Sequence, residues 1–208
     1  MMSKKNLVYI YMSFLSLFLY QNLSADVKFQ PVEKLNSGNY QFKVSKKINL
    51  SLNFQKGVSI VNLTRDYLNY FKTSSIYDTN EINISMEDGG KESVISFSMK
   101  EQRQTSHGSM VLEGKSHLRS SKEQLTYTFK TISIKASGNA SYTKSEEQIV
   151  SLRKEDSDSY SLTVSKVVEV DKPFFAPKAI FESEVKKGLR EDIENYAKQY
   201  LEILETSF

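Results

Sequence analysis

The stretch KAIFESEVKKGLREDIENYAKQYLEIL, residues 178–204, decides the fold. Its apolar side chains recur at steps of three and four residues among charged ones: Phe181, Val185, Leu189, Ile193, Tyr196 and Tyr200. This spacing is that of an α-helix with one apolar face. Pro173 and Pro177 mark where the chain leads into the helix, and Gly188 is tolerated inside it at roughly 1 kcal/mol relative to alanine. We therefore predict a helix roughly 40 Å long, at 1.5 Å per residue.

Most of the remaining chain alternates between apolar and polar residues. Residues 38–54 place an apolar side chain at nearly every even position, with Lys46 as the exception. A period of two indicates a strand with one buried face. The same alternation returns in six segments, separated by polar clusters that suit turns. These predicted strands are 81–87, 92–101, 107–114, 124–136, 145–154 and 159–170.

Three details refine this pattern. Residues 58–71 change to a spacing near 3.6, which predicts one or two short helical turns. Ile132 and Ile134 have the opposite parity to Phe129, which predicts a bulge or bend in that strand. Asp88-Gly89-Gly90 lies between two strands and is typical of a hairpin turn. The fold class is therefore α+β: one antiparallel sheet of about seven strands, with a long carboxy-terminal helix covering one face.

The first 25 residues have the layout of a secretory signal peptide. Lys4 and Lys5 are followed by an uncharged run over residues 7–20, and Ala25 supplies a small residue before Asp26. A run of about 14 residues is short for a membrane span, which needs roughly 20. We expect cleavage near residue 25, no stable transmembrane anchor afterwards, an amino-terminal extension over residues 26–37 and one domain over residues 38–208.

Charge and cysteine content narrow the classes of function. Loss of Lys4 and Lys5 would leave 26 basic and 25 acidic side chains, so a nucleic-acid partner is not expected. The chain has no cysteine, so an exported form must rely on its core and sheet rather than on disulfides. We expect a periplasmic or secreted protein, most simply in a bacterial envelope.

Two segments carry a resemblance to a known family. Leu63-Thr64-Arg65-Asp66-Tyr67-Leu68-Asn69-Tyr70-Phe71, in the predicted short helices, and Phe174-Phe175-Ala176-Pro177, before the last helix, resemble the START-like (SRPBCC) helix-grip superfamily of lipid carriers and polyketide cyclase-like proteins. The resemblance spans about residues 38–204. It implies a curved sheet wrapped around the final helix with an apolar cavity between them. The resemblance predicts the fold and says little about ligand or activity.

Such a cavity would draw its lining from inward-facing aromatic and aliphatic residues. We expect a hydrophobic small molecule or lipid to contact Phe97, Met99, Met110, Tyr127, Phe129, Phe181, Val185, Leu189 and Tyr196. Asp66 would cap a helix or stand at the cavity mouth. The same side chains would equally fill a dry core, and the sequence leaves both readings open.

The sequence gives little evidence of a catalytic or metal site. His107 and His117 lie off the inward face and have no cysteine to complete a metal site, so we expect surface histidines and no metal or cofactor. No G-x-S-x-G stretch marks a nucleophilic serine. The first hypothesis is an exported, non-enzymatic binding protein for a lipid or other hydrophobic molecule. A structural or partner-binding envelope protein with a filled core is the alternative, and a cyclase- or hydrolase-like enzyme is the third.

Overall fold

The computed structural model describes residues 26–51, 60–73, 77–87, 92–105, 108–156 and 159–206. The predicted signal peptide and the Asp88-Gly89-Gly90 turn lie outside these residues. Among the described residues, no helix combines the length and apolar character needed to cross a membrane.

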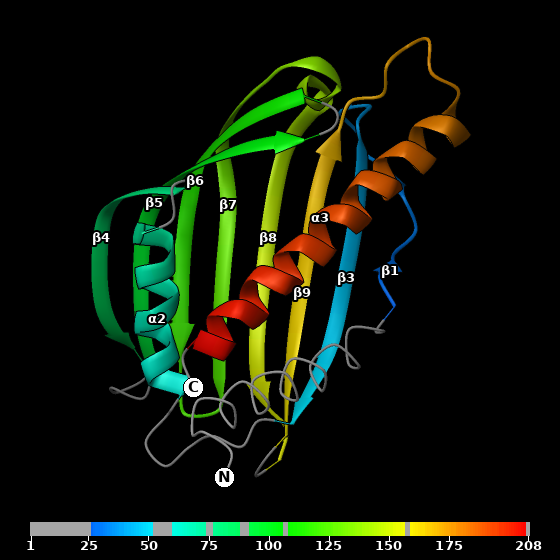
Figure 1. Ribbon diagram of the computed structural model, residues 1–208. Helices are drawn as coiled ribbons and strands as arrows, with labels where there is room; N and C mark the ends of the chain where they lie inside the picture. Colours follow the sequence, from blue (N-terminus) through cyan, green and yellow to red (C-terminus); the bar gives the residue numbers. More distant parts are fainter. Residues whose placement is uncertain are drawn as a thin grey trace, which may run out of the picture.

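One antiparallel sheet forms the body of the protein (Figure 1). Its strand order is β1-β3-β9-β8-β7-β6-β5-β4, and β2 pairs with β3 outside this path. The seven long strands are β3 (Tyr40–Ser51), β4 (Tyr77–Glu87), β5 (Glu92–Thr105), β6 (Gly108–Ser120), β7 (Gln124–Ala136), β8 (Thr143–Lys154) and β9 (Ser159–Val170). The seven strands expected from the alternation are thus present, and β4, β5 and β6 each extend four or more residues beyond the predicted bounds.

The expected extension also joins the sheet. β1 (Lys28–Phe29) and β2 (Glu33–Lys34) pair antiparallel with β3, and Val27 is buried. Because only two residues of each strand pair, they cover one edge of the sheet without adding a full strand.

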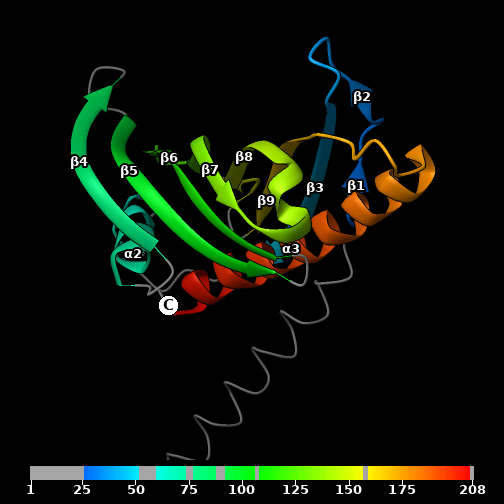
Figure 2. The ribbon, with the colours of Figure 1, turned by 90° about the horizontal axis from the view of Figure 1, so that it is seen from above.

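Two helices lie on the same side of the curved sheet, as Figure 2 shows. α2 (Ile60–Thr73) is a single helix where one or two short turns were predicted, and it packs against β4, β6 and β7. α3 (Lys178–Thr206) confirms the predicted long helix and packs against β3 and β9, and its contact with α2 joins the two helices. A curved antiparallel sheet gripping a long carboxy-terminal helix is the helix-grip fold predicted from the sequence.

The inward face of the sheet follows the predicted parity. In β9, for example, Leu162, Val164 and Val168 are buried, while Thr163, Ser165 and Val167 on the other face are partly exposed. Aromatic rings and aliphatic side chains from six of the long strands form one continuous core with both helices, and Ile82 of β4 packs against it.

The bulge predicted in residues 124–136 is present. The β6–β7 register steps from Gly114 opposite Thr131 to Glu113 opposite Ser133, which leaves Ile132 as the extra residue. Gly114 is required there, because a Cβ at this position would lie 2.3 Å from the Lys130 carbonyl oxygen and 2.6 Å from the Phe129 ring. Beyond the bulge β7 no longer pairs with β8, since that ladder ends at Lys130 opposite Glu147.

Candidate functional site

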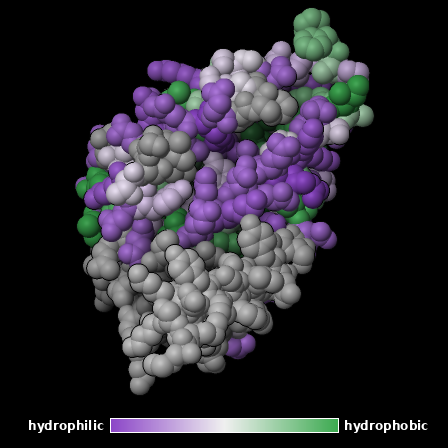
Figure 3. All heavy atoms as spheres, in the orientation of Figure 1, coloured by the Kyte–Doolittle hydropathy of each residue, from purple (hydrophilic) through white to green (hydrophobic). Residues whose placement is uncertain are grey.

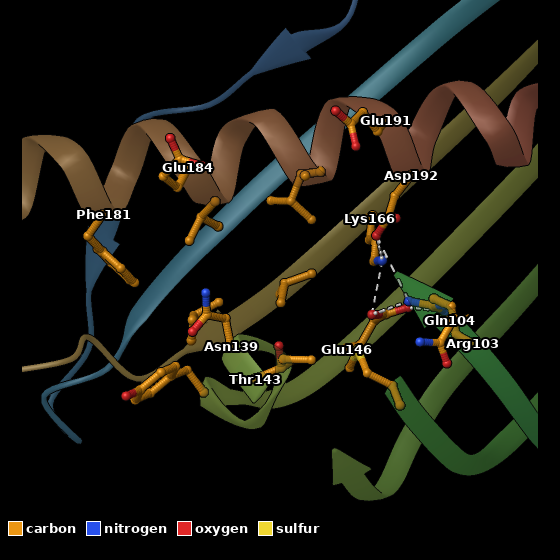
Figure 4. A pocket seen from close by; sticks show the side chains of 18 of the residues that line it. Arg103, Gln104, Asn139, Thr143, Glu146, Lys166, Phe181, Glu184, Glu191 and Asp192 are labelled. Carbon is orange, nitrogen blue, oxygen red and sulfur yellow. Dashed lines mark hydrogen bonds and ion pairs between the residues drawn. The ribbon is translucent and has the colours of Figure 1, made fainter. Parts of the chain in front are cut away.

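A cleft of about 890 Å³ lies beneath α3, whose residues from Ile180 to Gln199 contribute to its lining. Its walls come from β5, β6, β8, β9, α3 and the short 3₁₀ helix η3 (Gly138–Tyr142). Figure 4 shows α3 passing over one side of this space, with Asn139 and Thr143 on the other. The volume is within the range of small-molecule sites, roughly 300–1,000 Å³.

The outer part of the cleft is apolar. Its lining comes from β9, from the connection between β9 and α3, and from one face of α3, and includes Val168, Val170, Phe175, Phe181, Val185 and Leu189. Phe181 packs edge-to-face against Tyr40 and Phe42, with ring centroids 5.5 and 5.8 Å apart. These contacts hold the first turns of α3 against β3 and leave the neighbouring face of the helix toward the cleft.

The inner part of the cleft is charged. Arg103 on β5 donates hydrogen bonds to both carboxylates beside it, at 3.0 and 3.1 Å to Glu101 and at 2.9 and 3.1 Å to Glu146 on β8. Lys166 on β9 lies 3.0 Å from Glu146 and 2.5 Å from Asp192 on α3. Figure 4 shows four of these side chains converging from three strands and the helix: Arg103, Glu146, Lys166 and Asp192. We call Glu101, Arg103, Glu146, Lys166 and Asp192 the ion cluster.

The ion cluster is stable only as a whole, because most of it is buried. The side chains of Glu146 and Lys166 are each 2% exposed, and that of Arg103 is 12% exposed. An unpaired charge at such depth would cost several kcal/mol. Burial by itself would raise the pKa of Glu146, but Arg103 and Lys166 outweigh it and lower the pKa from 4.5 to about 2. Glu146 is therefore ionised at neutral pH.

The same balance acts on the arginine. Burial by itself would lower the pKa of Arg103, and Glu146, Tyr196 and Glu101 together raise it well above its ordinary value. Arg103 is thereby fixed in its charged form. Asp192, with 27% of its side chain exposed, is the more accessible carboxylate of the cluster and lines the cleft.

Tyr196 links α3 to the cluster. Its hydroxyl donates a 2.9 Å hydrogen bond to Glu101, and its ring lies 5.4 Å from the Arg103 guanidinium and 5.6 Å from the Lys166 ammonium. A cation above an aromatic face is attracted by the ring quadrupole. The ring and the hydroxyl of Tyr196 therefore both hold the helix to the charged floor of the cleft.

The nine predicted ligand-binding residues divide between two places. Five of them line the cleft: Met110, Phe181, Val185, Leu189 and Tyr196. The other four belong to the packed core away from this lining: Phe97, Met99, Tyr127 and Phe129. Whether any of the nine contacts a ligand stays a prediction.

Two of the four core residues, Phe97 and Tyr127, lie where α2 closes over the sheet, since both rings contact Phe71. Phe71 of α2 stacks on Tyr127 at 4.7 Å, and Ser116, Tyr127 and Met99 interact through the Tyr127 hydroxyl, which is 3.3 Å from the serine oxygen and 3.6 Å from the sulfur. Asp66, predicted as a helix cap or a residue of the cavity mouth, lies within α2, half-buried, and is outside the cleft lining.

His117 does not join the site. His117 is exposed on β6 and its Nδ1 lies 2.9 Å from the Ser96 hydroxyl, while His107 lies outside the described residues. The described part of the chain contains no group of three or more histidine, cysteine, aspartate or glutamate side chains placed to hold a metal ion.

The ion cluster was missed by sequence reasoning, although a signal existed. Glu101 and Arg103 continue the inward parity of Phe97 and Met99, and Lys166 falls between Val164 and Val168 on the inward face of β9. Charged residues at inward positions of separate strands are costly unless they meet. Their convergence depends on the strand order and register, which the sequence alone does not give.

Comparison with known proteins finds no matching family model and no matching curated protein. Solved structures of similar architecture exist. An aromatase/cyclase from Streptomyces sp. R1128 has a TM-score of 0.44 at 10% identity, over 80% of this chain and 93% of that one. A START superfamily protein from Mycobacterium smegmatis scores 0.37 at 18% identity, over 76% and 98% of the two chains. Human STARD10 scores 0.34 at 11% identity, over 99% and 85%. The likeness is one of fold, and nothing about ligand or activity follows from it.

Proposed function

We propose that this protein binds a hydrophobic or amphipathic small molecule in the cleft beneath α3. The observation that carries the proposal is the division of the cleft into an apolar outer part and a buried charged floor. Apolar walls with a few fixed polar groups are what ligand sites generally combine, because burial supplies affinity and the polar groups set orientation. A molecule with an apolar body and a polar end matches both parts.

A carrier role fits this floor better than catalysis. Each charged side chain of the ion cluster is within 3.1 Å of an opposite charge. Glu146, with its pKa held near 2, is a poor proton acceptor at neutral pH. We therefore propose a non-enzymatic role, in which the ion cluster orients a ligand through fixed charges.

The test uses the uncharged fluorophore N-phenyl-1-naphthylamine and a pair of matched variants. Val185→Trp places a large ring in the cleft, and Val167→Trp changes the same residue type on β9, where Val167 has the outward parity. We expect bright, saturable binding by the parent and by Val167→Trp, and at least tenfold weaker binding by Val185→Trp. Equal binding by all three proteins would contradict the proposed site.

A second measurement would identify the ligand that the protein binds in its host. Protein purified from its host would be extracted with organic solvent, and the extract analysed by mass spectrometry, with Val185→Trp as the control. An apolar species present in the parent and reduced in the variant supports the proposal. If the parent protein carries no apolar species and also fails to bind the fluorophore, the structural or partner-binding alternative is favoured.

Export to the periplasm or the medium is part of the proposal. It is supported by the basic start, the uncharged run over residues 7–20 and Ala25 before Asp26. The intact mass of the protein recovered from the host envelope should correspond to a chain beginning near Asp26. Recovery of the full-length chain from the cytoplasm alone would contradict export.

A further inference from the structure

The connection between β9 and α3 exposes a pair of phenylalanine side chains. Phe174 is 96% exposed and Phe175 is 70% exposed, and their rings meet edge-to-face at 5.4 Å. Ile180, in the first turn of α3, is 59% exposed. Figure 3 shows apolar atoms gathered at this end of the molecule, beside the polar outer face of α3. We call Phe174, Phe175 and Ile180 the aromatic tip.

The tip is held in place rather than left loose. The Lys172 ammonium donates to the carbonyl oxygens of Pro173 and Ala176, at 3.1 and 2.7 Å, and the Ala176 amide donates to the Pro173 oxygen at 3.0 Å. The turn that carries the two rings is therefore preorganised. Keeping such rings in water has no benefit for folding, and a grouped apolar protrusion of this kind marks a contact surface.

The charge along α3 points to the nature of that contact. Within α3, residues 178–190 contain four basic and two acidic side chains, and residues 191–206 contain one basic and five acidic ones. The first turn of α3 has no acidic residue and its last turn has no basic one. The helix dipole favours the reverse order, with acids at the amino end. The basic end is therefore not explained by helix stability, and it lies beside the aromatic tip.

We propose that the aromatic tip and the basic first half of α3 dock the protein on an anionic lipid bilayer. Aromatic rings insert at the membrane interface while lysine and arginine side chains meet anionic headgroups. The three tip side chains offer on the order of 500 Å², whereas a stable protein interface needs roughly 800 Å² from each partner. A protruding tip of this size suits insertion into lipid better than a protein contact.

The docking surface adjoins the cleft, since Phe175 and Ile180 also line it. A molecule leaving the bilayer at the tip would enter the cleft without crossing water. The proposal thus deepens the proposed function by naming lipid membranes as the source or destination of the ligand. Docking itself is measured on ligand-free protein, so its failure is distinguishable from a failure of ligand binding.

The chain contains no tryptophan, which provides a site-specific probe. Phe174→Trp places a single tryptophan at the tip. Its fluorescence therefore reports on the surroundings of the tip and not on those of the amino terminus. Ile84→Trp is the matched control, because Ile84 is an apolar residue 70% exposed on β4, at the opposite edge of the sheet from the tip (Figure 1). Each protein would be mixed with phosphatidylcholine vesicles, with and without phosphatidylglycerol, and with brominated lipids as quenchers.

We expect the emission of Phe174→Trp to shift to shorter wavelength and to be quenched on vesicles containing phosphatidylglycerol, with reversal by salt, while Ile84→Trp is unchanged. Adding Lys178→Gln and Lys187→Gln to Phe174→Trp should weaken vesicle binding about fivefold for each charge removed. No shift at the tip, or equal shifts at both positions, would overturn the proposal. So would equal binding to neutral vesicles, or a dimer that Phe174→Ser and Phe175→Ser convert to a monomer without any lipid response.

Discussion

The two ends of the space between the sheet and its helices differ in how they are filled. Under α2 and the last turns of α3, aromatic rings close the core: Tyr67 stacks on Tyr200 at 5.4 Å and Phe71 on Tyr127 at 4.7 Å. Under α3 from Ile180 to Gln199, a cleft of about 890 Å³ separates the helix from β5 and β8. At the closed end two helices cover the sheet side by side, whereas at the open end one helix spans it alone. The number of covering elements, more than the composition of the strands, decides where space is left.

The largest expected contrast comes from truncating one side chain at each end. Phe71→Ala should lower the free energy of unfolding by about 3–5 kcal/mol, because the ring is fully packed against Tyr127 and Phe97. Val185→Ala, half-buried on the cleft wall, should cost less than about 1.5 kcal/mol. Urea unfolding at pH 7 measures both. Equal losses would mean that the two ends are packed alike.

Acid should act mainly on the open end. The pKa of Glu146 is lowered from 4.5 to about 2, so its stabilisation is complete above pH 4.5 and is lost as the pH falls toward 2. The shift corresponds to about 3 kcal/mol. We expect the free energy of unfolding to fall over this range in the parent and to fall less in Glu146→Gln. Glu147→Gln, on the neighbouring position of β8, should behave like the parent, and an identical acid response in Glu146→Gln would contradict the assignment.

A smaller effect is expected where α3 meets the ion cluster. Tyr196→Phe removes the hydroxyl that donates to Glu101 at 2.9 Å, and should cost about 1.5–3 kcal/mol because the acceptor is a buried carboxylate. Tyr142→Phe, elsewhere on the cleft wall, should change stability by less than about 0.5 kcal/mol. If thermal unfolding shows the same small change for both variants, the hydroxyl of Tyr196 does not hold the helix.

The smallest effect should come from a tyrosine at the closed end. The Tyr67 hydroxyl is buried and has no hydrogen-bond partner among the described residues, and burial raises its pKa. Tyr67→Phe removes a desolvated polar group, so stability should stay within about 0.5 kcal/mol of the parent or rise slightly. A loss comparable to that of Tyr196→Phe would show that the Tyr67 hydroxyl has a partner.

Local patterns in the sequence determined most of the elements. The period of 3.6 over residues 178–204 predicts α3, and the alternation on either side predicts the seven long strands and their inward faces, because burial of one face imposes these periods whatever the topology. The parity change after Phe129 predicted the bulge now seen at Ile132. The resemblance of residues 63–71 and 174–177 to the helix-grip superfamily supplied the arrangement of sheet and helix.

Only the tertiary structure decided which inward residues face the cleft and which fill the core. Phe97 and Phe181 were both predicted to line the cavity, yet Phe71 of α2 covers the first, and the second lies at the cleft wall. Glu101 and Arg103 on β5 are distant along the chain from Glu146 on β8 and Lys166 on β9. A one-residue change of register would have turned any one of them outward. Charges become a site only when strand order and register bring them within hydrogen-bonding distance, and that is a property of the assembled sheet.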